Sequence, residues 1–251
     1  MGRLIAVTGK GGVGKTTISS LLVRSMVKKG DTPILVVDAD PNSNLNEVLG
    51  LSVEDTIGGI REEMAERSGA TPGGMAKHEY LELKVNECLI EAKGFDLVVM
   101  GRPEGPGCYC FANNVLRDVL KSLGKQYPHI VIDNEAGMEH MSRRITTSID
   151  HLLIVSTPTL RGLLAADRIQ ELVRQLKLSV GTMHLVINRA YDGLPPQVEK
   201  RIEEIGLPLI GVIPEEELVR EFDGSGRPLI ELPETSSTVR MLEDIVGALN
   251  V

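Results

Sequence analysis

Short apolar runs recur along this chain, and most of the intervals between them are long enough to hold a helix. The apolar residues within a run follow one another without alternation, which is typical of strands covered on both faces. Strands interleaved with helices in this way indicate a mostly parallel sheet with helices on both faces, so the pattern predicts an α/β fold. Seven runs have the length of a strand: 3–8, 33–38, 95–100, 129–133, 151–157, 183–188 and 208–213.

Helical spacing is clearest directly after the first run. Apolar residues recur on one face of a predicted helix over 15–29, and Gly30 then supplies a C-terminal stop signal. The widest interval, 41–94, is expected to hold two helices, at 53–69 and 78–94. We find no internal repeat. We therefore expect a single domain over 1–251, in which 41–94 is a helical elaboration.

Composition narrows the possible partners. The chain carries a formal net charge of −8, no Trp, four Tyr and three Phe, which argues against a basic or base-stacking nucleic-acid surface. No apolar run approaches the roughly 18–20 residues that cross a bilayer. The N-terminal "MGRLIAVTGK" lacks the pattern of a signal peptide. We expect a cytoplasmic protein with neither nucleic acid nor membrane as a partner.

The segment between the first run and the first helix has the pattern of a phosphate-binding loop. It reads "GKGGVGKT", from Gly9 to Thr16, and fits G-x-x-x-x-G-K-[ST] between a strand and a helix. Glycines allow backbone N–H groups to surround phosphate oxygens, and the helix N-terminus adds partial positive charge. Lys15 is expected to reach the β- and γ-phosphates, and Thr16 to hold Mg²⁺.

The same letters also fit a dinucleotide fingerprint. Gly9, Gly11 and Gly14 give G-x-G-x-x-G, and Asp38 ends the second run, where such folds place a ribose-binding acid. A dinucleotide site does not use a Lys-Thr pair at the helix entry, nor does it account for Lys10. The phosphate-loop interpretation is therefore preferred.

With Lys10 inside the loop, the motif is a deviant Walker A, K-G-G-V-G-K-T-T, and the chain resembles the MinD/ParA/NifH class of ATPases along essentially its whole length. In that class the second lysine reaches the partner's nucleotide across a dimer. The resemblance therefore implies that Lys10 and Lys15 are catalytic and that the ATP-bound protein is a homodimer. It also implies a nucleotide-binding loop made of Gly11, Gly12, Val13, Gly14, Lys15, Thr16 and Thr17.

Two further segments resemble the switches of this class. "VVDADPNSNL" (36–45) resembles the first switch, in which Asp40 would orient the attacking water and support Mg²⁺. "HIVIDNEAGMEH" (129–140) resembles Walker B running into the second switch. Asp133 would hold a Mg²⁺ water there, and Gly137 would sense the γ-phosphate.

The resemblance also implies contacts to the base and separates subclasses. Asn188 matches an adenine-contacting asparagine, and Pro214 lies in the second base-contacting loop. Partition ATPases need basic DNA-binding residues, and MinD-like proteins end in a basic amphipathic membrane helix. This acidic chain shows no obvious basic patch, and its final segment, "STVRMLEDIVGALNV", has Arg240 as its only base, so both subclasses are disfavoured.

Two of the three cysteines lie together in "EGPGCYCFANN" (104–114). Cys108 and Cys110 could be a redox pair, half of a metal site or a chance juxtaposition. In an extended segment their side chains would point the same way, but thiolate sites usually take four ligands. Cys88 has core-like helical spacing and is expected to pack. The missing ligands then come most simply from a second copy of Cys108 and Cys110.

A deviant Walker A combined with C-Y-C after the third run resembles the accessory ATPases of the CooC/AcsF type. The resemblance implies an ATP-driven metallochaperone that dimerises with ATP or metal. Its cargo would be nickel, with zinc possible at the same site, and its client carbon monoxide dehydrogenase or acetyl-CoA synthase. Two alternatives stay open: a positioning or partition ATPase switch, and a thiol-redox protein that uses the cysteine pair.

Overall fold

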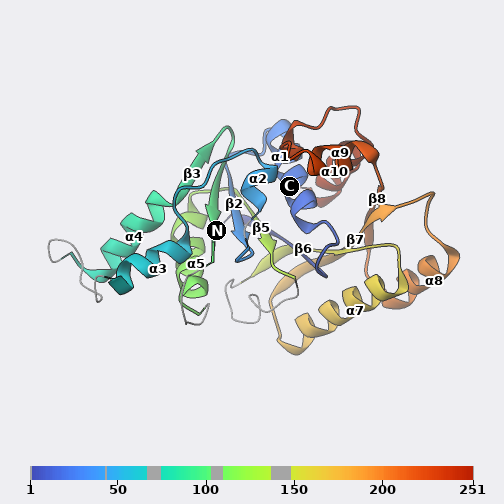
Figure 1. Cartoon of the computed structure of the whole chain (residues 1–251). Helices are drawn as coiled ribbons and strands as arrows, with labels where there is room; N and C mark the ends of the chain where they lie inside the picture. Colours follow the sequence, from blue (N-terminus) through green and yellow to red (C-terminus); the bar gives the residue numbers. More distant parts are fainter. Residues whose placement is uncertain (1, 43, 67–74, 103–109, 137–147, 251) are drawn as a thin grey trace.

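The computed structural model describes residues 2–42, 44–66, 75–102, 110–136 and 148–250, and for 61–62, 64–66, 77–78 and 110–113 it describes the backbone only. One eight-stranded sheet runs through the molecule in the order β3-β4-β2-β5-β1-β6-β7-β8 (Figure 1). All neighbouring strands are parallel except β3 and β4. The strands are β1 Arg3–Gly9, β2 Ile34–Ala39, β3 Leu89–Ala92, β4 Phe95–Val99, β5 His129–Asn134, β6 Ile149–Ser156, β7 Val180–Ala190 and β8 Leu209–Pro214.

Each of the seven predicted runs forms a strand of this sheet, which confirms the predicted α/β fold. The central strand β1 shows why continuous apolar runs were the right signal. Leu4 and Ala6 face one core, while Ile5 and Val7 face the other. Both faces are buried because helices cover both sides, so alternating polar residues are not needed.

The helices divide between the two faces of the sheet. Helices α1 and α10 pack on one face, and α3, α4, α5, α7 and α8 pack on the other. Figure 1 shows α3, α4 and α5 near the β3 edge and α7 and α8 near the β8 edge. The helices are α1 Lys15–Lys29, α2 Leu45–Val48, α3 Ile57–Glu66, α4 Lys77–Glu87, α5 Cys110–Ser122, α7 Leu160–Gln175, α8 Pro196–Ile205, α9 Glu217–Gly224 and α10 Ser237–Leu249, with short 3₁₀ turns η2 Leu123–Lys125 and η3 Leu229–Glu231.

The predicted helix over 78–94 is wrong in its second half. Helix α4 ends at Glu87, and Leu89–Ala92 forms the edge strand β3 instead. Ala92 pairs with Phe95 across a two-residue turn in which Gly94 has φ +89°. The glycine permits this turn, and the antiparallel strand covers the edge of β4. Cys88 lies at the end of α4 and is buried in the core, as expected.

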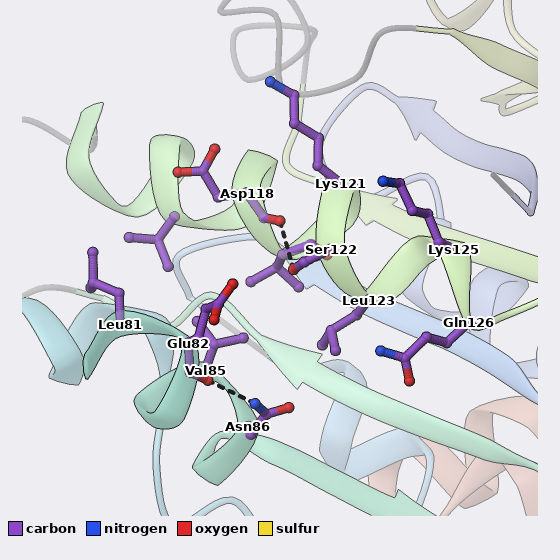
Figure 2. A pocket seen from close by; sticks show the side chains of 12 residues that line it. Leu81, Glu82, Val85, Asn86, Asp118, Lys121, Ser122, Leu123, Lys125 and Gln126 are labelled. Atoms are coloured by element: carbon purple, nitrogen blue, oxygen red, sulfur yellow. Dashed lines mark hydrogen bonds between the residues drawn. The ribbon is translucent and has the colours of Figure 1, made fainter. Parts of the chain in front are cut away.

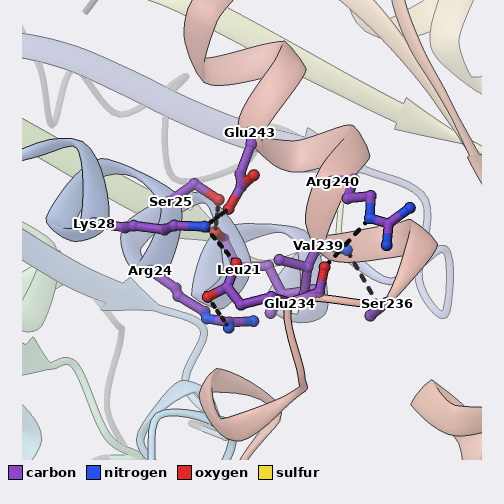
Figure 3. Close-up of polar contacts among 9 residues, drawn as sticks. All are labelled: Leu21, Arg24, Ser25, Lys28, Glu234, Ser236, Val239, Arg240 and Glu243. Atoms are coloured by element: carbon purple, nitrogen blue, oxygen red, sulfur yellow. Dashed lines mark hydrogen bonds and ion pairs between the residues drawn. The ribbon is translucent and has the colours of Figure 1, made fainter.

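Helix α1 is joined to the C-terminal part of the chain by apolar packing and by a polar cluster (Figure 3). Lys28 contacts Glu234 and lies 2.6 Å from Glu243, while Arg24 lies 2.9 Å from Glu234. Lys28 is half exposed, so solvent screens these ion pairs and they contribute little stability individually. The buried contacts between α1 and α10 therefore hold the far end of the phosphate-loop helix.

Candidate functional site

The loop between β1 and α1 has a shape that requires glycine. Gly12 and Gly14 have φ values of +78° and +92°, in the left-handed region that glycine adopts without strain. A Cβ on Gly14 would also lie 2.3 Å from Asn188 Nδ2, and one on Gly9 would lie 2.4 Å from the Val155 carbonyl oxygen. Backbone contact therefore excludes a side chain at Gly9, and a side chain at Gly14 would displace the Asn188 amide.

Asn188 fixes this loop from the neighbouring half of the sheet. It lies near the end of β7, and its Nδ2 donates to the Val13 carbonyl oxygen at 2.8 Å. Its Oδ1 accepts from the Arg189 backbone N–H at 2.9 Å. The residue predicted to contact adenine thus holds the phosphate loop in this structure. Sequence reasoning did not find this second contact.

A cavity of about 320 Å³ lies beside the start of α1. It brings together Thr17, Asn188 and Pro214, three residues that sequence reasoning assigned to nucleotide binding from separate segments. Charged residues from the β8–α9 region also line it, including Glu215 and Glu216. The position next to the phosphate loop suits a base or ribose.

Glu216 organises one wall of this cavity and was missed by sequence reasoning. Its Oε2 accepts hydrogen bonds from the hydroxyls of Ser236, Ser237 and Thr238 and from the Thr238 backbone N–H, over 2.7–3.0 Å. Partial burial opposes ionisation of Glu216, but these donors outweigh it and lower its pKa. The donors lie some 20 residues further along the chain. No local sequence pattern predicts these hydrogen bonds.

The first turn of α1 presents the expected phosphate-binding groups. Lys15 is the first residue of the helix and is largely buried, while Lys10 is exposed. The first turn contains no acidic residue, so nothing there offsets the positive end of the helix. Thr16 Oγ1 lies 3.3 Å from Asn44 Oδ1, to which it donates. The loop, the amine and the helix terminus together fit a phosphate chain.

Two buried carboxylates lie side by side next to this helix. Asp38 on β2 and Asp133 on β5 are register partners and are at most 1% exposed. Ser19 Oγ donates to Asp133 at 3.0 Å. Burial raises the pKa of Asp133 to about 6, and burial with the neighbouring Asp133 charge raises the pKa of Asp38 to about 7. Oxygen donors from Asp133 and Thr16 beside α1 fit Mg²⁺, a hard cation.

Asp40 lies one residue beyond β2, at the carboxyl edge of the sheet. Its Oδ1 accepts from the backbone N–H of Asn42 at 2.9 Å and from Asn42 Nδ2 at 3.2 Å. It is partly exposed, unlike Asp38 and Asp133. The structure therefore gathers Asp40 and Asp133 at one edge, where β2 and β5 end beside each other.

Three predicted residues fall partly or wholly outside this description. Gly137 and Cys108 lie outside the described residues, and of Cys110 only the backbone is described, as the first residue of α5. Within the described ranges, no cluster of three or more His, Cys, Asp or Glu side chains is placed to hold a metal ion. Cys108 and the side chain of Cys110 lie outside those ranges, so the predicted thiolate site stays a prediction.

A larger cavity of about 530 Å³ lies between α4 and the end of α5 (Figure 2). Its lining includes the apolar residues Leu81, Val85 and Leu123 and the basic residues Lys121 and Lys125. None of the residues predicted for the nucleotide or the metal line it. The chemistry-bearing residues instead gather around the start of α1.

Comparisons with known proteins show which family the chain resembles. The model of the CobQ/CobB/MinD/ParA nucleotide binding domain matches residues 4–229. An uncharacterized ATP-binding protein of Methanocaldococcus jannaschii is 44% identical over 96% of both chains. The carbon monoxide dehydrogenase accessory protein CooC of Rhodospirillum rubrum is 31% identical over 91% of this chain and 89% of its own.

Solved structures agree on the fold. MinD of Pyrococcus horikoshii complexed with Mg-ADP superposes with a TM-score of 0.72 over 100% of this chain and 96% of that chain, at 21% identity. A ParA family ATPase of Chlorobium tepidum gives 0.74 over 98% of both, at 20% identity. No helix in the described part of the chain is long and apolar enough to cross a membrane.

Proposed function

Because this chain belongs to the CobQ/CobB/MinD/ParA nucleotide-binding family, we propose that it is an ATPase that acts as a homodimeric metallochaperone. The observation that carries the ATPase part is the glycine loop fixed by Asn188 beside a buried carboxylate pair. The metallochaperone part rests on the C-Y-C segment and on likeness to a carbon monoxide dehydrogenase accessory protein.

In the proposed reaction, water attacks the γ-phosphorus of ATP and the bond to the β,γ-bridging oxygen breaks. ADP and inorganic phosphate are released, and the proton of the water passes to the phosphate. Asp40 orients the water, and Lys15 and Lys10 neutralise charge on the phosphates, Lys10 from the partner subunit. Thr16, Asp40 and Asp133 are the residues that would hold Mg²⁺, and the ion would add further charge neutralisation at the phosphates.

The remaining nucleotide contacts are assigned by the same proposal. The backbone of 11–17 surrounds the phosphates, and the cavity beside Thr17 takes the base, with Asn188 and Pro214 at its wall. Asn188 already donates to Val13, so its Oδ1 face or a rearranged amide would meet the adenine. Gly137 would respond to the γ-phosphate. Loss of that phosphate would then loosen the dimer.

We further propose nickel as the cargo, with zinc able to occupy the same site. Cys108 and Cys110 from each of two chains would supply four thiolates, which suit borderline and soft ions. The client would be a nickel enzyme, carbon monoxide dehydrogenase or acetyl-CoA synthase. The accessory role named for the Rhodospirillum rubrum relative supports this choice.

Metal titration with a matched cysteine control tests the cargo. Ni²⁺ or Zn²⁺ is titrated into ATP-loaded wild-type protein, into Cys108→Ser/Cys110→Ser and into Cys88→Ala. We expect about one ion per dimer in the wild type and in Cys88→Ala, whose cysteine is buried in the core. The double serine variant should lose that ion. Undiminished binding by the double variant would contradict the thiolate site.

The same preparations distinguish the alternatives. Reversible oxidation of Cys108 with Cys110, together with no metal binding by the wild type, would favour the thiol-redox protein. ATP-dependent sedimentation with DNA or with anionic vesicles would favour a positioning or partition switch. Both results are separate from ATP hydrolysis, so they overturn the metallochaperone without overturning the ATPase.

A further inference from the structure

Asp38 is a buried acid for which the proposed reaction has no direct use. It lies on β2, and all the remaining residues of that strand, Ile34–Ala39, are apolar. Its side chain is inaccessible to solvent and neighbours the equally buried Asp133. Burying a carboxylate beside another costs free energy unless specific hydrogen bonds compensate. The groups that donate hydrogen bonds to the Asp38 carboxylate therefore indicate its structural role.

Both oxygens of Asp38 bind the backbone of the segment that follows β2. Oδ1 accepts from the backbone N–H of Asp40 at 3.1 Å, and Oδ2 accepts from that of Leu45 at 3.1 Å. One carboxylate thus binds the chain at both Asp40 and Leu45. The far end is anchored as well, because Leu45 is fully buried in the core on the α1 face.

We propose that Asp38 is a positioning residue that holds Asp40 in place for hydrolysis. Its hydrogen bonds fix the backbone of the first switch at Asp40 and at Leu45 before nucleotide binds. The carboxylate of Asp40 therefore need not be ordered during the reaction. Preorganisation of this kind lowers the barrier because the entropy is lost in folding. This inference rests on the proposed ATPase and extends it.

The test is Asp38→Asn, which keeps the shape but turns one acceptor into a donor that faces a backbone N–H. We expect kcat for ATP hydrolysis to fall by about 10–100-fold, the cost of a small misplacement. ATP affinity should stay within about two-fold, and the backbone amides of Asp40 and Leu45 should exchange hydrogen faster. The melting temperature should not fall, since a buried charge beside Asp133 is removed. Should asparagine prevent folding, Asp38→Ser is measured instead.

A double variant shows whether Asp38 acts through Asp40. In an Asp40→Ala background, Asp38→Asn should cause no further loss of kcat, because coupled residues are not additive. The matched control is Asp96→Asn on the adjacent strand β4, where Tyr127 donates to the carboxylate. This control should leave kcat unchanged. Equal losses of kcat with and without Asp40 would overturn the inference.

The outcomes separate this inference from the proposed function. A wild-type protein without ATPase activity, or a fully active Asp40→Ala, contradicts the proposed reaction. In that case, hydrogen exchange of the Asp40 and Leu45 amides, compared between wild type and Asp38→Asn, still decides whether Asp38 positions the segment. Unchanged exchange in Asp38→Asn overturns the positioning role whatever the activity.

Discussion

At the scale of single residues, Gly14 offers the cleanest test of the phosphate loop. Gly14 and Gly30 share φ +92°, but a Cβ on Gly14 would meet Asn188, whereas one on Gly30 would meet nothing within 4 Å. Replacing either with alanine should cost about 1 kcal/mol of stability from the left-handed backbone. Only Gly14→Ala should also weaken ATP binding, by more than about ten-fold (roughly 1.4 kcal/mol).

Thermal melts and titration with a fluorescent ATP analogue measure the two effects separately. The Gly30→Ala control removes the backbone strain from the comparison. If both variants bound the analogue as the wild type does, the loop described here would not be the nucleotide site.

Individual residues also show what the sequence could and could not reveal. The end of an apolar run placed Asp133 at the carboxyl edge of the sheet, because parallel strands end there together. The bond from Asn188 to Val13 was not foreseeable, since it joins residues 175 positions apart. Asp38 was considered as the acid of a rejected dinucleotide site and not as a positioning residue, because its two backbone partners follow from the fold of the segment after β2.

At the scale of elements, the edge hairpin was misread for a physical reason. Val85, Cys88, Leu89 and Ala92 have helical spacing, which is a local signal. Pairing along the edge of β4 is a tertiary interaction that local spacing does not report. The turn at Gly94 allows β3 to fold back and pair with that edge. The seven longer runs carried no such conflict, so they were predicted correctly.

The junction of β8, α9 and α10 should respond to acid through Glu216. The lowered pKa means that its ionised form stabilises the fold, fully above the ordinary pKa near 4.5 and progressively less as pH falls through the lowered value. Glu216→Gln should therefore reduce the free energy of unfolding at neutral pH, by about 1 kcal/mol for a partly exposed, charge-assisted site. The difference from wild type should vanish in acid.

Urea unfolding between neutral pH and acid measures this dependence. Glu217→Gln is the control, since Glu217 is exposed on the same helix and contacts Arg220 at the surface. A constant difference between Glu216→Gln and wild type at every pH would contradict the role of the ionised carboxylate.

At the scale of the whole molecule, Lys10 tests the proposed ATP-bound dimer. It is exposed in the single chain, whereas Lys15 is largely buried at the start of α1. Lys10→Ala should therefore bind ADP as the wild type does but stay monomeric with ATP, because it lacks the charge that reaches the partner's nucleotide. Analytical ultracentrifugation with ADP and with ATP measures this. An ATP dimer of wild-type affinity in the variant would remove Lys10 from the interface.

The order of strands in the sheet determines how many strands separate the predicted nucleotide site from the segment that leads to the cysteines. Strand β2, which leads to Asp38 and Asp40, lies directly beside β4, whose chain continues toward Cys108. The Met100 backbone N–H donates to the Asp38 carbonyl oxygen at 2.9 Å. Meanwhile the far end of α1 is held against α10. If the proposed ATPase is correct, a conformational change at Asp40 needs to cross only one pair of adjacent strands to reach the chain that leads to Cys108.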